Sequence, residues 1–152
     1  MRCMVTGATG LIGTRLVREL LQQDFQVNVL VRSPGKLAED VSEQVNMFQG
    51  DILDKTSINN AVKGCSAVFH LAAFAGIWAK DKMLPYRVNV TGTRNILEAA
   101  LKNDVGKVVY TSSAGTLSPS QGGIPVNENM PMPESYNTDY EMSKRQAEQL
   151  FC

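Results

Sequence analysis

The sequence lacks a long apolar run, an excess of charge of one sign and a secretion signal, and each absence argues against a class of protein. No stretch approaches the roughly 18 consecutive apolar residues that a membrane-spanning helix needs. Lys and Arg total 15, as do Asp and Glu, so the zero net charge offers no electrostatic footprint for nucleic acid or an anionic membrane. The opening "MRCMVTG" runs directly into an apolar strand pattern, unlike a signal peptide. We therefore expect a cytoplasmic protein with a small-molecule partner.

Cysteines are few and scattered. Cys3, Cys65 and Cys152 are odd in number and form neither a CxxC pair nor another zinc-ligand spacing. Free thiols in a reducing compartment are the expected state, and a redox or metal role is the alternative. We predict no metal site.

What is present is an alternation of short apolar runs and helical patterns in 152 residues, the length of one domain. The spacing predicts strands over 3–7, 27–32, 45–51, 67–73 and 107–113. Helices are predicted after Gly10, over 54–63 and 83–102, and from about Thr138 onward. In the 83–102 helix we expect Val90, Leu97, Ala100 and Leu101 to share one face, and residues 115–137 read as a long loop suspected of function.

Such an alternation predicts an α/β fold, a doubly wound parallel sheet covered by helices on both faces. The expected strand order is 3-2-1-4-5, with the switch point between the first and fourth strands. Ligands of such sheets bind beyond the carboxyl ends of the strands at that point.

The motif "TGATGLIG" places Gly7, Gly10 and Gly13 between the first strand and the first helix. Gly7 would make a tight turn, Gly10 would let backbone N–H groups approach a pyrophosphate, and Gly13 would let helix and sheet pack closely. The spacing is GxxGxxG rather than the GxGxxG of the simplest fingerprint, and turns or close packing alone also select glycine. The position of the motif favours dinucleotide binding.

The ends of the second and third strands carry residues that suit the rest of a dinucleotide. Arg32 stands where NAD-selective sites often hold an acidic residue, and its planar guanidinium suits a 2′-phosphate, so NADP is favoured over NAD, with Lys36 as additional help. The alternative is that Arg32 is a solvated charge. Asp51 is placed to accept a hydrogen bond from an adenine amino group, to cap the next helix, or to do both.

Tyr140 and Lys144 lie four residues apart on one face of the final helix. A phenol with a pKa near 10 needs about 4 kcal/mol of stabilisation of its anion to act as a base near neutrality, and an ammonium about 4 Å away supplies that order of energy. A hydroxyl of Ser112 or Ser113, after the fifth strand, could meet Tyr140 and hold a substrate carbonyl oxygen, while a nicotinamide supplies the hydride. The alternatives are a solvated Tyr–Lys pair and a turn-capping serine.

Six segments, "TGATGLIG", "GDILD", "HLAA", "YRVNVTGTRNILEAA", "VVYTSSAGTL" and "YEMSKRQAEQ", together resemble the extended short-chain dehydrogenases/reductases, an NAD(P)-dependent epimerase/dehydratase superfamily with a Rossmann fold. The nearest branch is similar to dihydroflavonol reductases and nucleoside-diphosphate-sugar epimerases. This resemblance implies that Tyr140 is the catalytic acid/base, that Lys144 lowers its pKa and holds the nicotinamide ribose, and that Ser113 is the catalytic serine. It also implies that Asn89 supports the active site, and the alternative is a structural hydrogen bond inside the long helix. His70 reads as a satisfied strand-end histidine rather than a catalyst.

The cofactor-binding residues that we predict on this basis are Gly7, Thr9, Gly10, Leu11, Ile12, Gly13, Arg32, Lys36, Asp51, Ile52, Leu71, Ala72, Ala73, Tyr140 and Lys144. In members of the family the long helix and the tyrosine helix form a four-helix dimer interface, so the resemblance also implies a homodimer.

The chain departs from the family in length, because it ends eight residues after Lys144, where relatives continue into most of their substrate pocket. We expect a single dinucleotide-binding domain over 1–152 without its substrate-binding part: a fragment, a shortened protein or a partial gene product that turns over poorly alone. Three functions follow: a carbonyl reductase using NADPH, an NAD-dependent sugar-nucleotide epimerase or dehydratase, and a non-catalytic dinucleotide-binding module.

Overall fold

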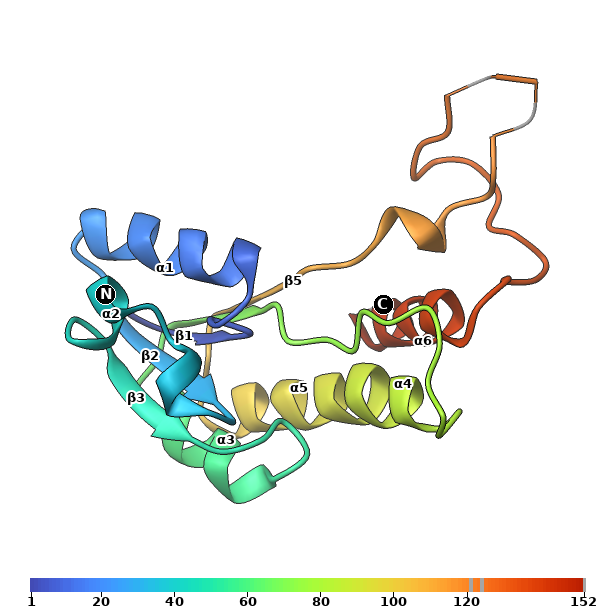
Figure 1. Ribbon diagram of the computed structural model, residues 1–152. Coiled ribbons are helices and arrows are strands. Elements are labelled where there is room, and N and C mark those ends of the chain that lie inside the picture. Colours follow the sequence, from blue (N-terminus) through green and yellow to red (C-terminus); the bar gives the residue numbers. More distant parts are fainter. Residues whose placement is uncertain (121, 124, 152) are drawn as a thin grey trace.

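A five-stranded parallel sheet forms the centre of the computed structural model, which describes residues 1–120, 122–123 and 125–151 (Figure 1). The strand order is β3-β2-β1-β4-β5, which confirms the predicted order and places the switch point between β1 and β4. Cys152 lies outside the described residues. The strands are β1 (Arg2–Thr6), β2 (Gln26–Val31), β3 (Asn46–Gln49), β4 (Ala67–His70) and β5 (Lys107–Tyr110).

Helices cover both faces of the sheet, with α1 on one face and α3 and α5 on the other (Figure 1). The helical elements are α1 (Leu11–Gln22), η1 (Pro34–Lys36), α2 (Glu39–Ser42), α3 (Lys55–Val62), α4 (Leu84–Tyr86), the π-helical turn η2 (Arg87–Thr91), α5 (Gly92–Lys102), η3 (Ala114–Thr116), α6 (Asp139–Glu148) and η4 (Gln149–Phe151).

The pleat of β1 divides the core between the two faces. Cys3 and Val5 pack with Val17 of α1, whereas Met4 packs with Ile58 of α3 and other residues on the opposite side. Successive side chains of a strand point to opposite faces of the sheet. A strand with a continuous apolar run therefore contributes side chains to the core on both faces. Cys3 and Cys65 are buried free thiols, and burial raises the pKa of each to about 11, which keeps them protonated near neutrality.

The long helix predicted over 83–102 is a composite of α4, η2 and α5, and one predicted face is wrong. Leu101 is 80% exposed, whereas Ala100 is buried. The buried face of α5 carries Ile96 and Ala99 instead, because these positions meet α3 and the sheet. Ala100 and Leu101 are adjacent in α5 and therefore point about 100° apart, and the buried face also includes the polar residues Thr93 and Asn95, which a count of apolar residues leaves out.

The strands predicted over 45–51, 67–73 and 107–113 end earlier than expected. Their last residues, such as Ala72 and Ser113, lie beyond the ends of the strands.

The described residues between Leu117 and α6 extend away from the sheet (Figure 1). The Tyr136 hydroxyl connects them to the end of η3, because it donates to the carbonyl oxygen of Thr116 at 3.2 Å. A capping box of Thr138 and Glu141 then starts α6.

Candidate active site

The turn after β1 is built from glycines because the protein's own backbone approaches it. Gly7 has a φ of +75°, and a Cβ there would lie 2.7 Å from the amide nitrogen of Ala72. A Cβ on Gly13 would lie 2.1 Å from the carbonyl oxygen of Gly7. Side chains are therefore excluded at positions 7 and 13 by the fold itself, as close packing of helix and sheet requires.

Gly10 is different, because a Cβ there would meet only the carbonyl oxygen of Gly7, at an ordinary 3.4 Å. Its φ of −88° is accessible to any residue. Gly10 is the N-cap of the twelve-residue helix α1 and lines a cleft, so its bare backbone borders open space at the N-terminus of the helix. An anion fits such a place, since the positive end of the helix dipole favours it.

A cleft of about 230 Å³ lies at the switch point, at the carboxyl ends of the strands. It is lined by Gly7, Thr9, Gly10, Leu30, Val31, Arg32, Gly50, Asp51, Ile52, Leu71, Ala72, Ala73 and Val88. We call this the switch-point cleft. Nine of the predicted cofactor-binding residues are therefore brought together there by four different segments of the chain.

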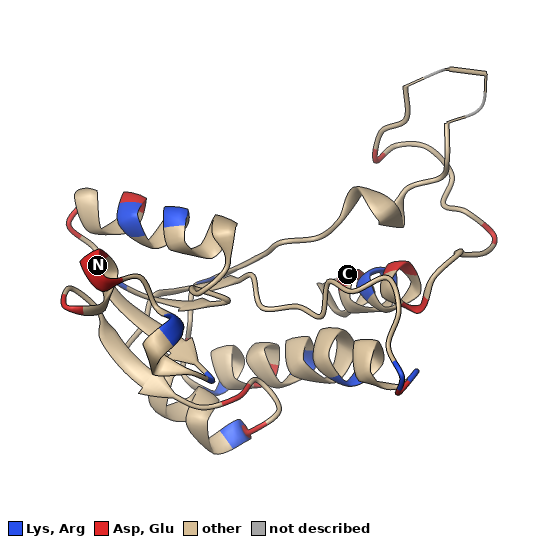
Figure 2. Cartoon of the chain, viewed as in Figure 1, with Lys and Arg blue, Asp and Glu red and all other residues tan. Residues whose placement is uncertain are grey.

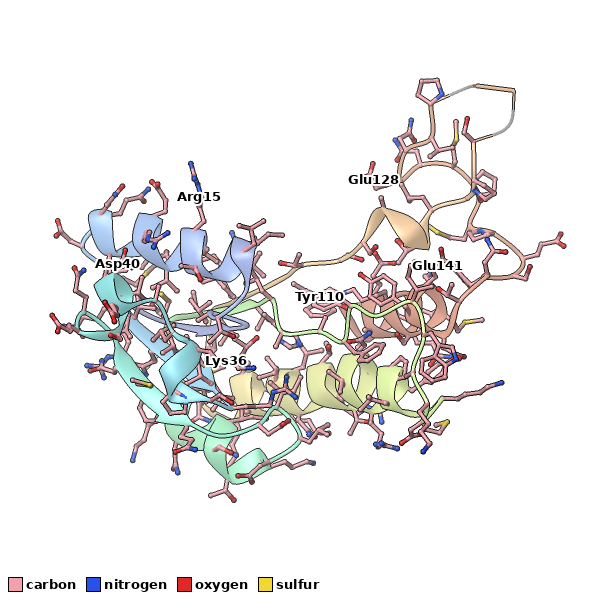
Figure 3. The ribbon with its side chains drawn as sticks, viewed as in Figure 1. Arg15, Lys36, Asp40, Tyr110, Glu128 and Glu141 are labelled. Carbon is pink, nitrogen blue, oxygen red and sulfur yellow. The ribbon has the colours of Figure 1, made fainter. Side chains whose placement is uncertain are left out.

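Other predicted cofactor-binding residues lie outside that lining. Leu11 and Ile12 project from the first turn of α1 and are 91% and 63% exposed. Gly13 is covered by the glycine turn. Lys36 is an exposed residue of η1 (Figure 3), so only movement of its long side chain or a bound ligand would bring it to the cleft.

At the rim of the switch-point cleft, Arg32 is exposed and forms neither a salt bridge nor a hydrogen bond with the residues that the structure describes. Asp51 accepts a hydrogen bond from the backbone N–H of Leu53 at 2.9 Å. The suggestion that Asp51 caps the next helix is wrong, because Asp54 is the N-cap of α3 and accepts from the N–H of Thr56. Asp51 also lines the cleft.

Lys144 of α6 is buried although it carries an ammonium. Its Nζ donates to the carbonyl oxygen of Thr111 at 2.7 Å and lies 4.2 Å from the centre of the Tyr110 ring. Burial lowers the pKa of Lys144 from 10.5 to about 8, and the nearby Glu148 carboxylate partly opposes this effect. Tyr110 lies beside α6 (Figure 3) and stacks on Phe151, with ring centres 5.1 Å apart.

Tyr140 is half-buried one turn before Lys144 on α6, so the predicted pair shares a helix face. The two candidate serines follow β5, beside the carbonyl group that holds Lys144. Ser113 accepts a hydrogen bond from the N–H of Gly115 at 3.2 Å, which is the turn-capping role weighed for it, and Ser112 donates to Glu148. No hydrogen bond joins the Tyr140 phenol to either serine among the described residues.

Asn89 lies in the π-helical turn and is buried. Its side chain accepts from the N–H of Phe74 at 2.7 Å and donates to the carbonyl oxygen of Phe74 at 3.1 Å. It also donates to the hydroxyl of Ser143, on α6, at 2.9 Å. The side chain therefore connects the segment after β4 with the tyrosine helix, whereas the alternative placed it in a bond inside the long helix. Functional sites often coincide with π-helical turns.

His70, at the end of β4, is fully buried and bonded on both ring nitrogens. Nδ1 lies 2.7 Å from the hydroxyl of Thr6, and Nε2 lies 3.0 Å from the hydroxyl of Thr93. Burial, together with the Lys144 ammonium, lowers the pKa of His70 to about 3, so the ring is neutral near neutrality. This environment is that of a satisfied strand-end histidine.

Sequence reasoning did not single out Tyr110, Glu148, Thr6 or Thr93 as parts of the site. The sequence pattern identifies Tyr110 only as a strand residue, although it lies directly before "TSS" and beside Lys144 in the structure. Thr6 and Thr93 are fully buried polar residues inside apolar patterns. A buried hydroxyl needs a partner, which is the signal that could have drawn attention to them once His70 was placed.

Among the described residues, no helix combines the length and the apolar character needed to cross a membrane, and no group of three or more His, Cys, Asp or Glu side chains is arranged to hold a metal ion. In the view of Figure 2, basic and acidic residues are both scattered over the helices and loops.

A doubly wound parallel sheet with a glycine turn and a cleft at its switch point defines the Rossmann class of dinucleotide-binding proteins. The family model of the 3-beta hydroxysteroid dehydrogenase/isomerase family matches residues 4–152, and the chain belongs to this family.

Named relatives agree with this family. The chain is 38% identical to a putative dihydroflavonol 4-reductase of Synechocystis over 95% of its length and 42% of that protein. It is 34% identical to cinnamoyl-CoA reductase 1 of Oryza sativa subsp. japonica, over 97% of this chain and 44% of that one. The UDP-glucose 4-epimerase of Thermus thermophilus, solved in complex with NAD, has a TM-score of 0.86 at 29% identity, over 99% of this chain and 50% of that one. The chain spans half or less of the length of these proteins.

Proposed function

We propose that this chain is the dinucleotide-binding part of an NADP-dependent reductase that transfers a hydride to the carbonyl carbon of a small substrate. The observation that carries the proposal is the bare backbone of Gly10 at the N-terminus of α1, facing a cleft that holds most of the predicted cofactor contacts. The reductase names of the two curated relatives support the reaction type.

The residues present fit a dinucleotide. The glycine turn and the first N–H groups of α1 would hold the pyrophosphate, because a side chain at Gly10 would occupy the space that the phosphates need. Asp51 has acceptor capacity left for an adenine amino group, and Ala72 and Ala73 would line the path toward the nicotinamide.

The preference for NADP rests on Arg32. A guanidinium without a partner among the described residues, at the rim of the cleft, suits a 2′-phosphate and cannot accept the hydrogen bond of a ribose 2′-hydroxyl. Lys36, four residues further along, adds positive charge to the same region.

When bound, the dinucleotide supplies the hydride. The residues of the chain supply the proton and the charge. Tyr140 would donate its phenolic proton to the oxygen of the reacting carbonyl, and the Lys144 ammonium would stabilise the phenolate that remains. The position of Lys144 is fixed by the Thr111 carbonyl group and the Tyr110 ring. The hydroxyl of Ser113 would orient the substrate oxygen.

A second candidate is an NAD-dependent epimerase or dehydratase, favoured by the similarity to an epimerase solved in complex with NAD. Such an enzyme regenerates its cofactor within each cycle and retains it. A cofactor that stays bound through purification and exchanges slowly would favour this second candidate over the reductase. If Tyr140→Phe leaves the function of the protein unchanged, the third candidate, a non-catalytic dinucleotide-binding module, is favoured instead.

We also propose a homodimer through α5. Leu97 is half-buried and Leu101 is largely exposed, and their spacing of four residues places both on one outward stripe of α5. A second copy of the chain would cover this stripe. The family resemblance supports an interface at this helix.

The test of the cofactor is a calorimetric titration of the chain with NADPH and NADH in parallel. We expect NADPH to bind at least about tenfold more tightly, a difference of about 1.4 kcal/mol. Arg32→Gln should remove this difference by weakening NADPH binding alone. Arg15→Gln is the matched control, because Arg15 is an exposed residue on the outer side of α1 (Figure 3). Equal affinities in the wild-type chain would contradict the NADP preference, and no binding of either nucleotide would overturn the proposed function.

A further inference from the structure

A line of buried polar side chains runs from the glycine turn to the tyrosine helix. It crosses the centre of the molecule, through a core that is otherwise largely apolar. Its members are Thr6, His70, Thr93, Asn89 and Ser143. Each of these residues is at most 1% exposed.

The direction of the hydrogen bonds in this line is determined by its carbonyl groups. Thr93 Oγ1 lies 2.5 Å from the carbonyl oxygen of Asn89, and because a carbonyl oxygen only accepts, Thr93 donates its one proton there. Thr93 therefore accepts from His70, so the Nε2 atom of His70 carries a proton.

The other ring nitrogen follows from the neutrality of the ring. The ring has one proton, on Nε2, so Nδ1 is bare and accepts from the hydroxyl of Thr6. Thr6 in turn accepts from the N–H of Ala72 at 3.1 Å. Both bonds of the Thr6 hydroxyl are thereby assigned, directly before Gly7.

The far end of the line is determined in the same way. Ser143 Oγ lies 2.7 Å from the carbonyl oxygen of Tyr140, so Ser143 donates to it. The hydroxyl of Ser143 then accepts from the side-chain amide of Asn89. The line ends on the backbone of Tyr140.

We propose that His70, as the Nε2–H tautomer, is a positioning residue that couples the glycine turn to the turn of α6 that carries Tyr140. Every hydroxyl in the line has one assigned donor role, so reversing one bond would leave a buried group unpaired. A displacement of the glycine turn by a bound ligand would thus shift the backbone of Tyr140 through these hydrogen bonds. The inference rests on the proposed function for the identity of that ligand.

The tautomer gives a direct test, because His70 is the only histidine of the chain. Long-range ¹H–¹⁵N correlation spectra of the ¹⁵N-labelled chain at neutral pH should show a neutral ring with its proton on Nε2. In Thr93→Val, which lacks the accepting hydroxyl, the Nε2 proton should exchange faster with water, and Thr93→Ser should restore the slow exchange. A proton on Nδ1, or a charged ring, would overturn the proposal.

The coupling is tested with ADP, which carries the adenosine and pyrophosphate but has no nicotinamide that could reach α6. In the wild-type chain, ADP should shift the backbone amide resonances of Gly10 and Asp51 and also that of Ser143. Thr93→Ser should keep the shift at Ser143, and Thr93→Val should lose it while the shifts at Gly10 and Asp51 remain. A shift at Ser143 that survives in Thr93→Val would refute the coupling.

The two ideas fail in different ways. If ADP shifts neither Gly10 nor Asp51, the proposed function is overturned, and the coupling is then refuted as a response to dinucleotide. If ADP binds with shifts at the cleft but never at Ser143, the proposed function stands and the coupling alone is rejected.

Discussion

Lys144 carries a buried ammonium group that contributes little to the stability of the fold. The charge has one hydrogen bond, to the Thr111 carbonyl group, and one aromatic face, that of Tyr110. Loss of hydration is the largest cause of its lowered pKa, so the fold is destabilised by keeping this side chain charged. Local conflicts of this kind are expected at functional sites rather than elsewhere.

We therefore expect Lys144→Met to stabilise the chain and, if the proposed function holds, to abolish hydride transfer. Methionine fills a similar volume without a charge, and the free energy of unfolding should rise by about 1 kcal/mol or more. Chemical denaturation measures the stability, and an ADP titration of the same variant should give wild-type affinity. A clear loss of stability would contradict this account of the lysine.

The higher free energy of unfolding expected of Lys144→Met depends on pH through the pKa of Lys144. Below pH 8 the lysine is charged in the folded and unfolded states, so the full penalty of burying it is present. Between pH 8 and the ordinary value of 10.5, the folded state has lost the proton while the unfolded state retains it, so the penalty declines as the pH rises. The advantage of Lys144→Met should accordingly be constant below pH 8 and shrink above it.

At the scale of elements, two glycines of the same sequence motif are required for different reasons, one for packing and one for ligand binding. Gly13 is required by the packing of α1 on the turn, because the obstacle to a side chain is the Gly7 carbonyl group. Gly10 meets no such obstacle, so the fold tolerates a side chain there and only a ligand would be displaced.

Alanine at each position should therefore have opposite consequences. Gly13→Ala should lower the free energy of unfolding by about 3 kcal/mol or more, because a backbone contact cannot relax by a change of rotamer. Gly10→Ala should cost no more than about 1 kcal/mol of stability, the usual range for a change of N-cap residue. Its affinity for ADP should nevertheless fall at least about tenfold, or 1.4 kcal/mol. Thermal unfolding and calorimetry distinguish the two outcomes, and normal ADP binding by Gly10→Ala would contradict the assignment of the phosphate position.

In the composite helix α4–η2–α5, apolar periodicity alone did not determine which residues are buried. Counting apolar residues placed Leu101 with the buried Ala100, although it is largely exposed. The buried face of α5 includes the polar residues Thr93 and Asn95, which a count of apolar residues leaves out. The π-helical turn before α5 is equally invisible to such a count, and in that turn Asn89 makes its contacts with Phe74 and Ser143.

For the whole molecule, the order of the strands could be predicted because alternating strands and helices permit few topologies. Nine residues of the cleft could be predicted from the motifs and the family resemblance, and the strand order explains why they meet, since they follow the carboxyl ends of β1 to β4. The other lining residues, Leu30, Val31, Gly50 and Val88, were not predicted. The polar line through His70 could not be predicted, because it joins residues as far apart in sequence as Thr6 and Ser143. Nothing local distinguishes a buried threonine that holds a histidine from one that fills a strand.

The proposed dimer leads to a prediction for the molecule as an assembly. Leu101→Glu should convert a dimer into a monomer in sedimentation velocity, because a carboxylate would be buried in the apolar stripe of α5. Ile77→Glu is the control, because Ile77 is equally exposed at 80% but lies outside α5. A wild-type chain that sediments as a monomer would contradict the homodimer.

The close approach of Gly7 to the segment after β4 has an evolutionary consequence. Most deleterious core substitutions can be suppressed by a smaller neighbour, but the atoms nearest to a Cβ at position 7 are the main chain of Leu71 and Ala72. No exchange of amino acids at those two positions removes peptide atoms. Selection for second-site revertants of Gly7→Val should therefore return glycine itself and no compensating change at residue 71 or 72.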